Sequence, residues 1–394
     1  MHGAQAAGRR GAVTCEKGAC AMAVNRVRRL YRFGQSVWLD QLSRELLQTG
    51  RLAKMIAAKE VSGVTSNPTI FDKAIEGSTY YDEQISALVG RHPKMGAEAL
   101  YEALVIKDIQ GAADLLRPVY ERSGKVDGYV SLEVSPKLAY ETEATMEDVR
   151  RLFWLVGRPN VFIKIPATDE GLPAIRAMLG EGVNVNVTLM FSQQDYTNVA
   201  RAYLAGLEKF FRAGGDLSRL ASVASYFVSR IDVAVDRLLA EGSPLRGRIA
   251  IANTKVAYAM FQKTFSSARF LRLREKGARV QRLLCASTST KNPAYSDVLY
   301  AEGLIGPDTI NTMPTETLEA FRDHGKARLS MTEDLAGAKK DLRALARAGI
   351  DLDEVCRRLK VEGVEKFSES FDALLATLEQ KRKRLAPRRA AARR

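Results

Sequence analysis

The feature that most constrains the fold of this chain is a succession of short apolar runs separated by segments with helical periodicity. Short apolar runs bounded by turn residues are typical of strands buried in a parallel sheet. Eight such runs, alternating with helices in a chain of 394 residues, predict a single α/β domain folded as a (β/α)8 barrel of the TIM type rather than an open doubly wound sheet. The expected strands are residues 36–40, 61–68, 128–135, 161–168, 183–189, 221–227, 282–287 and 309–313.

Helical periodicity and capping signals place helices between these strands. Ser192 is a typical N-cap, and Gly50 is a typical residue after a helix end. No G-x-G-x-x-G or Walker pattern follows any expected strand, which argues against a nucleotide-binding fold. The expected helices are residues 43–49, 80–121 with a break near 91–93, 146–155, 171–179, 192–213, 232–240, 249–277 and most of the chain from the last strand to about 378, with a break near 349.

The net charge of +14 lies at the two ends of the chain. Residues 381–394 contain eight basic residues and no acid, and the stretch through Arg32 contains seven basic residues against one acid. Basic stretches without periodicity are usually solvated and disordered. We therefore expect a basic disordered leader at 1–27, a barrel domain at 28–380 and a basic disordered tail at 381–394. Neither end carries a recognition motif, so no specific nucleic-acid partner is expected.

Only four cysteines and three histidines occur in the chain. This is too sparse for a disulfide framework or a structural zinc site, and we expect no metal and no cofactor. No apolar run approaches the length of a membrane span, and the N-terminus lacks the apolar core of a secretory signal. These features favour a cytoplasmic protein without a membrane partner, and they leave monomer and homodimer as open alternatives.

One expected strand, residues 161–168, carries a lysine in its middle. Lysine is rarely buried unless it is paired or functional, and burial disfavours its charged form. A neutral amine is a nucleophile toward carbonyls, as in Schiff-base enzymes. Lys164 is therefore a candidate imine-forming residue. The alternative is a lysine near the strand end whose ammonium group reaches water.

Other polar residues fall toward the carboxyl ends of the expected strands, where the active sites of such barrels are built. Strand side chains alternate between the two faces. If the valines of residues 183–189 face the helices, Asn186 and Thr188 point into the barrel. We therefore expect one mouth to bring together Asp40, Asn67, Glu133, Lys164, Asn186 and Thr188.

This combination suits imine chemistry on a hydroxyketone. The lysine would attack the carbonyl, one carboxylate would move protons directly or through a water, and a second would deprotonate the hydroxyl at the bond that breaks. Taken singly, Asn67 beside Pro68 also fits a cap or turn, and Glu133 fits an ion pair at a strand end. Burying these polar groups together is costly unless they serve one another, which favours a shared site.

Five ordered stretches carry a resemblance to a known family. Residues 63–71 (GVTSNPTIF) and 161–168 (VFIKIPAT) resemble the two signature sequences of the transaldolase family. Residues 186–192, 224–230 and 286–293 are similar to its longer bacterial branch in order and spacing, and the resemblance covers roughly residues 28–380. It implies a class I, Schiff-base (β/α)8 enzyme of the non-oxidative pentose phosphate pathway. Such an enzyme moves a dihydroxyacetone unit from sedoheptulose 7-phosphate to glyceraldehyde 3-phosphate, giving erythrose 4-phosphate and fructose 6-phosphate.

The resemblance implies a role for each candidate residue. Lys164 would form the imine, Glu133 and Thr188 would position the catalytic water, and Asp40 would be the acid/base for carbon–carbon cleavage. Two asparagines would bind substrate hydroxyls, and a serine and an arginine would hold the phosphate. The implied substrate-binding residues are Asn67, Asn186, Ser225, Arg230, Ser287 and Lys291.

The last two of these residues depart from the pattern of shorter family members, which carry an arginine after the seventh strand. Here Lys291 would supply a point charge in place of a forked guanidinium, with Ser287 beside it. For Arg230 the alternative is an ion pair with Asp232 or a contact at a helix start.

Two other functions remain open from the sequence. A lyase similar to fructose 6-phosphate aldolase would share the barrel and the lysine, although that activity is associated with shorter chains and a different acid/base. A barrel that only binds, attached to nucleic acid through its basic ends, would lose its binding with those ends and with added salt.

Overall fold

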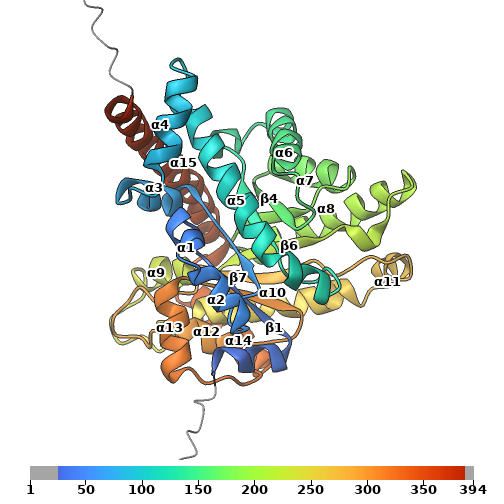
Figure 1. Cartoon of the computed structure of the whole chain (residues 1–394). Helices are drawn as coiled ribbons and strands as arrows, with labels where there is room; N and C mark the ends of the chain where they lie inside the picture. The colour runs from blue at the N-terminus through green and yellow to red at the C-terminus, as the bar shows by residue number, and fades with distance from the viewer. Residues whose placement is uncertain (1–24, 387–394) are drawn as a thin grey trace, which may run out of the picture.

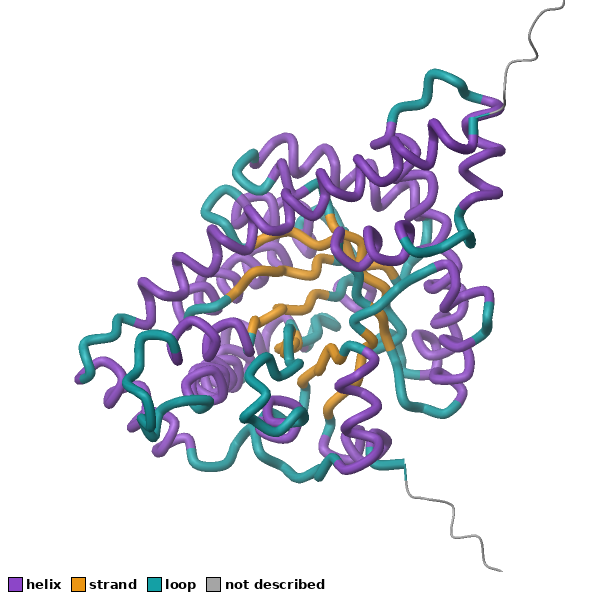
Figure 2. Tube along the Cα trace, turned by 90° about the vertical axis from the view of Figure 1, so that its left-hand side faces the viewer, coloured by secondary structure: helices purple, strands orange, loops and turns teal. Residues whose placement is uncertain are grey.

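The computed structural model describes residues 25–386 of the chain. Eight parallel strands close into one barrel in sequence order, and the eighth pairs with the first. Figure 2 shows the strands at the centre and the helices around them, so the predicted (β/α)8 fold is confirmed. The strands are β1 (Gln35–Leu39), β2 (Gly63–Val64), β3 (Val130–Glu133), β4 (Val161–Pro166), β5 (Val185–Met190), β6 (Ser222–Phe227), β7 (Arg282–Ala286) and β8 (Thr309–Met313).

The helices form an outer layer and also cover the carboxyl end of the barrel (Figure 1). Three short 3-10 segments are η1 (Val27–Phe33), η2 (Pro136–Leu138) and η3 (Leu217–Arg219). The α-helices of the first half are α1 (Arg44–Gln48), α2 (Arg51–Ala57), α3 (Pro68–Glu76), α4 (Asp82–Arg91), α5 (Ala97–Arg122), α6 (Thr142–Val156) and α7 (Gly171–Leu179). Those of the second half are α8 (Gln193–Arg212), α9 (Ser229–Asp236), α10 (Ile249–Phe265), α11 (Ala268–Arg274), α12 (Leu299–Gly303), α13 (Thr315–His324), α14 (Leu335–Arg347) and α15 (Leu352–Leu385).

All eight expected strands are present, and two differ in detail from the prediction. β2 comprises only Gly63–Val64, because the chain turns at Asn67 into a helix. The alternation expected through residue 189 breaks at Leu189, which has a φ of 58° where the register of β5 against β6 shifts. A positive φ in a non-glycine residue is typical of a bulge, which redirects the strand directly after Thr188.

Helix α3 is absent from the sequence prediction, although its start carries two clear signals. The Asn67 side chain accepts a hydrogen bond from the backbone N–H of Ile70, and Pro68 occupies the first helical turn. Asparagine at the N-cap and proline at the first position are both favoured there. The turn predicted at Asn67–Pro68 is therefore a helix start, and the predicted capping role of Asn67 is present in the structure.

The long C-terminal helix α15 lies across the end of the barrel beside α3, α4 and α5 (Figure 1). Side-chain hydrogen bonds join it to α3, from Thr69 to Ser370 over 2.7 Å and from Thr377 to Asp72 over 3.2 Å. Because these residues are about 300 positions apart, the helix ties the C-terminal end of the domain to its first βα units.

The helix α15 also corrects one predicted boundary. It continues to Leu385, and Lys381 is buried with its ammonium 2.7 Å from a carboxylate oxygen of Asp82. The prediction that the disordered tail starts at residue 381 is therefore wrong, because this lysine is paired rather than solvated. At the other end, Val27 is buried in η1, so the prediction that the disordered leader extends to residue 27 is wrong as well. The remaining predictions of disorder concern residues 1–24 and 387–394, which lie outside the described residues.

The amino end of the barrel is closed by a buried polar network. The Asp127 carboxylate accepts a hydrogen bond from the Trp38 indole N–H over 2.6 Å and from Ser62 over 2.9 Å, and Arg282 lies 3.8 Å away. Burial of the Asp127 carboxylate is tolerated because several partners satisfy its charge. The ring of Trp38 packs over Gly63, where an added Cβ would lie 2.5 Å from the ring. A functional cavity is consequently expected at the opposite, carboxyl end.

Within residues 25–386, no helix combines the length and the apolar character needed to cross a membrane.

Candidate active site

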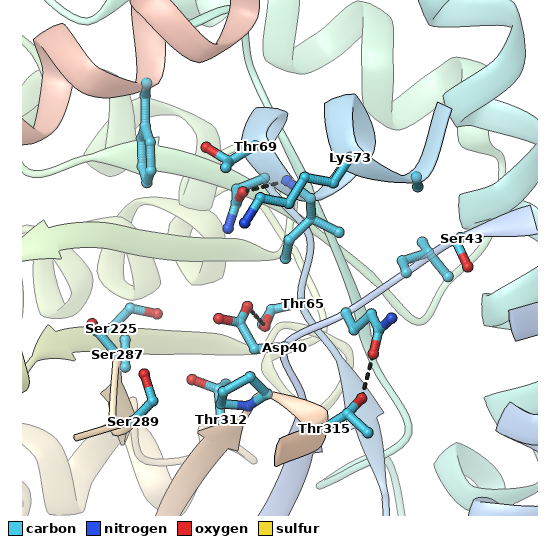
Figure 3. A pocket seen from close by; sticks show the side chains of 18 of the residues that line it. Asp40, Ser43, Thr65, Thr69, Lys73, Ser225, Ser287, Ser289, Thr312 and Thr315 are labelled. Atoms are coloured by element: carbon cyan, nitrogen blue, oxygen red, sulfur yellow. Dashed lines mark hydrogen bonds between the residues drawn. The ribbon is translucent and has the colours of Figure 1, made fainter. Parts of the chain in front are cut away.

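A cavity of about 630 Å³ opens at the carboxyl end of the barrel. Figure 3 shows side chains from several strands and from α3 pointing into it. Of the ten residues expected at this site, eight line the cavity: Asp40, Asn67, Lys164, Thr188, Ser225, Arg230, Ser287 and Lys291. The other two, Glu133 and Asn186, lie next to residues that line it.

Lys164 is buried in β4, with 6% of its surface exposed. Its ammonium nitrogen donates to the backbone carbonyl of Ser66 over 3.0 Å and lies 3.4 Å from Oε2 of Glu133. The alternative in which this lysine reaches bulk water is therefore wrong. A buried lysine with one carboxylate partner is positioned to exchange a proton with it and to present its nitrogen to a carbonyl in the cavity.

Glu133 lies at the end of β3, directly opposite Lys164 in the register of the two strands. Burial raises the pKa of its carboxyl group, while the charge and hydrogen bond of Lys164 lower it. The Asp40 carboxylate adds to the rise, and Arg230 opposes it. A carboxyl group with an elevated pKa beside an amine is suited to general acid–base catalysis.

Asp40 follows β1 and is half-buried at the cavity wall. Its Oδ1 accepts a hydrogen bond from Oγ1 of Thr65 over 2.7 Å, and Figure 3 shows this pair. Burial raises the pKa of Asp40, and the Thr65 hydrogen bond and the charge of Lys164 lower it. The structure thus places two carboxyl groups with elevated pKa values near one lysine, as the sequence predicted for the mouth.

Thr188 and Asn67 each present a polar group to the cavity. Oγ1 of Thr188 is buried and has no hydrogen-bond partner among residues 25–386. A buried hydroxyl without a protein partner is suited to bind a water or a substrate oxygen. In Asn67 the carbonyl oxygen caps α3, which leaves the amide N–H groups as the part suited to a ligand.

Asn186 is fully buried beneath the cavity. Its amide nitrogen donates to the hydroxyl of Ser131 over 3.0 Å, and its carbonyl oxygen accepts from Ser225 over 2.7 Å. Because Ser225 lines the cavity and Asn186 does not, Asn186 in this arrangement orients the serine hydroxyl. The predicted inward face of β5 is present, since both Asn186 and Thr188 lie on the barrel side.

Arg230, near the start of α9, has its guanidinium over two aromatic rings, 5.2 Å from the centroid of Phe227 and 5.8 Å from that of Phe367. Burial lowers the pKa of this arginine, and the charges of Glu133 and Asp40 raise it. The alternative ion pair with Asp232 is absent from the described structure, where Asp232 accepts from the N–H of Ala250. The guanidinium is therefore held by the rings with its donors available to an anion.

Ser287 and Lys291 line the same side of the cavity after β7. Ser287 has a φ of 56°, and its hydroxyl lies 3.1 Å from that of Ser229. The ammonium of Lys291 donates to the hydroxyl of Ser289 over 2.5 Å. Strained backbone at a cavity wall is common at ligand sites. Arg230 and Lys291 thus provide positive charge around a group of serine hydroxyls.

The comparisons with known proteins agree with this geometry. Residues 37–378 match the family described as Transaldolase/Fructose-6-phosphate aldolase. The chain belongs to this family. It is 46% identical over 382 residues to Transaldolase 2 of Nostoc punctiforme, covering 93% of this chain and 100% of that protein. It is 50% identical over 353 residues to the transaldolase of a Parafrankia species, covering 88% of this chain and 95% of that protein. The transaldolase of Thiobacillus denitrificans is 49% identical over 352 residues, covering 88% and 98%.

Membership of the transaldolase family confirms the resemblance drawn from the five motifs. The roles of individual residues are a separate matter, and they stay predictions until variants are measured. Within the described part of the chain, no group of three or more potential metal ligands lies together. The site consists of side chains that carry protons, positive charge and hydroxyl groups.

The sequence interpretation missed three residues of this site. Thr65 lies inside the first motif, and its contact with Asp40 could have been recognised only from the pairing of β1 with β2. Lys73 lines the cavity from α3, a helix that was not expected (Figure 3). Phe367 comes from α15, and its ring lies 5.9 Å from the ammonium of Lys164. Helical periodicity does not reveal which end of the barrel a distant helix covers.

Proposed function

We propose that this chain is a transaldolase that transfers a dihydroxyacetone unit through a Schiff base on Lys164. The donor is sedoheptulose 7-phosphate and the acceptor is glyceraldehyde 3-phosphate, with erythrose 4-phosphate and fructose 6-phosphate as products. The observation that carries the proposal is the buried Lys164 with Glu133 at 3.4 Å, at the wall of a cavity of about 630 Å³. The membership of this chain in the transaldolase family supports the same reaction.

In the proposed first step, Lys164 transfers a proton to Glu133 and its nitrogen attacks the ketone carbon. A second proton passes from that nitrogen to the new alkoxide oxygen, which gives the carbinolamine. Its hydroxyl group leaves as water when Glu133 returns the first proton, and the nitrogen lone pair forms the C=N bond of the iminium. A water held between Glu133 and the free hydroxyl of Thr188 relays these protons. Microscopic reversibility assigns the same groups to hydrolysis of the imine.

In the proposed second step, Asp40 removes the proton from the donor hydroxyl beside the bond that breaks. The carbon–carbon bond then cleaves, its electrons pass to the iminium, and an enamine remains on Lys164 while the aldose leaves. The acceptor aldehyde reverses this sequence, and its new alkoxide takes the proton from Asp40. Thr65 keeps Asp40 oriented through its 2.7 Å hydrogen bond.

Substrate binding in this proposal uses the remaining cavity side chains. Arg230 and Lys291 supply charge for the phosphate, with hydroxyls from Ser225 and Ser287. Asn67 offers its amide N–H groups to a sugar hydroxyl, and Asn186 holds Ser225 in place. The sparse cysteines and histidines favour a cytoplasmic enzyme without a cofactor. Monomer and homodimer are both compatible with this proposal.

Borohydride trapping with fructose 6-phosphate, followed by peptide mass spectrometry, tests this function. We expect a reduced adduct on the peptide that contains Lys164, and none in Lys164→Ala. An adduct elsewhere, or none, would refute the Schiff-base assignment. Adding erythrose 4-phosphate separates the two enzyme classes, because a transaldolase forms sedoheptulose 7-phosphate faster than it releases free dihydroxyacetone. Release of dihydroxyacetone that the acceptor leaves unchanged would instead indicate the lyase.

A further inference from the structure

A second cavity lies behind the active site. It has a volume of about 280 Å³ and is walled by α5, α6, the segment after β3 and α15. Glu133 lines this second cavity and is absent from the wall of the first, whereas Lys164 lines the first and is absent from the wall of the second. The hydrogen-bonded pair Lys164–Glu133 therefore spans the partition between the two cavities.

One face of α15 forms part of this partition. Phe367 lines the first cavity and Phe371 lines the second. Residues four apart lie above one another on a helix, so the two rings stand side by side over the barrel end. The ring of Phe371 packs edge-on against Tyr101 of α5, with centroids 5.3 Å apart.

The two cavities differ in charge as well as in size. The first is lined by four cationic side chains and three carboxylates, and the second by four carboxylates and two cationic side chains. A phosphorylated sugar is therefore repelled from the smaller cavity, while water and protons are not. The acidic residues of the second cavity are Glu98, Glu102, Glu133 and Asp148.

We propose that the second cavity is a separate route for water and protons to Glu133, distinct from the opening that admits the sugar phosphates. The proposal rests on the proposed function, because the route serves the imine chemistry of Lys164. Formation of the iminium releases one water, and its hydrolysis consumes one. While the sugar occupies the first cavity, this water exchanges past Glu133 through the second.

Tyr101 is the further positioning residue that this route implies. It lines the second cavity together with Glu133. Burial raises the pKa of Tyr101, and the charges of Glu133 and Asp148 add to that rise. The phenol therefore keeps its proton and can donate to a water that passes to the carboxylate.

The first test blocks the route without touching the substrate cavity. Ser135→Phe places a ring in the second cavity, which Ser135 lines two residues after Glu133. We expect kcat to fall by about tenfold, less than the roughly 100- to 10,000-fold of a full general acid–base contribution because Glu133 itself is retained, with KM unchanged and an increased solvent deuterium isotope effect. Tyr101→Phe keeps the packing against Phe371 and should change the isotope effect in the same direction. Tyr140→Phe, at an exposed site outside both cavities, is the matched control.

The second test measures access directly. In Ser135→Cys, iodoacetamide labelling of residue 135 is followed by peptide mass spectrometry, before and after borohydride trapping on Lys164. Equal labelling rates support a separate opening. Labelling that is lost after trapping would overturn the proposal, because the reagent would then have entered through the first cavity.

The outcomes separate this route from the function itself. Failure of the unmodified enzyme to form the trapped adduct refutes the proposed function. An enzyme that forms the adduct, but whose kcat and isotope effect are the same in Ser135→Phe and Tyr101→Phe as in the unmodified protein, refutes the route alone. If Ser135→Phe fails to fold, Tyr101→Phe and the labelling of Ser135→Cys still decide the question.

Discussion

The hydrogen bond from Thr65 to Asp40 should set the pH at which activity is lost on the acid side. Burial raises the pKa of Asp40, and the Thr65 hydroxyl, 2.7 Å from Oδ1, is the largest influence that lowers it. The proposed role of Asp40 needs the ionised carboxylate, which is lost as the pH falls through that pKa. Thr65→Val removes the hydroxyl and keeps the shape of the side chain. The pKa of Asp40 should then rise, and the acid limb should move to higher pH.

The size of the effect follows from the bond that is removed. A hydrogen bond to a charged group contributes about 1.5–3 kcal/mol, and about 1.4 kcal/mol corresponds to a factor of ten in an equilibrium constant. On the acid limb the ionised fraction of Asp40, and with it kcat/KM, should fall by about tenfold or more. On the plateau, where the carboxylate is ionised in both proteins, kcat/KM should stay close to that of the unmodified enzyme.

The assay is kcat/KM for fructose 6-phosphate with erythrose 4-phosphate, measured across the acid limb. Thr65→Ser restores a hydroxyl and should return the limb toward its original position. Thr315→Val is a matched change, because Thr315 lines the same cavity but donates to Gln41 rather than to Asp40. An acid limb that stays in place in a folded Thr65→Val enzyme would show that another group titrates there.

Three further outcomes are expected. Lys164→Ala should abolish turnover while circular dichroism and thermal unfolding show an intact fold; residual imine trapping would exclude this lysine as the nucleophile. Lys291→Ala should raise KM for phosphorylated donors with a smaller change in kcat, and an unchanged KM would move the phosphate site elsewhere. Arg44→Ala leaves the fully buried Asp108 with the Tyr81 hydroxyl as its remaining side-chain partner. Urea unfolding should then show a loss of about 3–5 kcal/mol, whereas a loss below 1 kcal/mol would contradict the importance of this pair.

Much of the fold was predictable because each strand carries its own local signal. A parallel strand buried on both faces is apolar along its length. The ends of the helices between strands are marked by capping residues such as Ser192. The inward direction of Asn186 and Thr188 followed from parity alone, since their valine neighbours suit the helix layer. The sequence predicted that Lys164 and Glu133 lie at the same mouth of the barrel, but not that they contact each other. The sequence of neither strand determines the register of β3 against β4.

The remaining features depend on contacts between distant segments. No local pattern predicts the bulge at Leu189, where the positive φ is imposed on a residue that disfavours it. The tail boundary at residue 381 was misplaced because a run of basic residues predicts solvation, whereas Lys381 meets Asp82 across the fold. The second cavity could not be predicted from the sequence either, because its walls come from α5, α6 and α15, which are distant from one another in the chain.

The placement of α15 shows how residues outside every motif determine the site. Lys360 is paired with Asp195 at one end of the helix, and Lys381 is paired with Asp82 at the other. Between these two anchors lies Gly363, where a Cβ would come 2.9 Å from the Leu189 side chain, so the helix can approach the bulged end of β5. That approach brings Phe367 over Lys164. The bulged end of β5 and the ring that covers the nucleophile are therefore both contacted by one turn of α15, through Gly363 and Phe367.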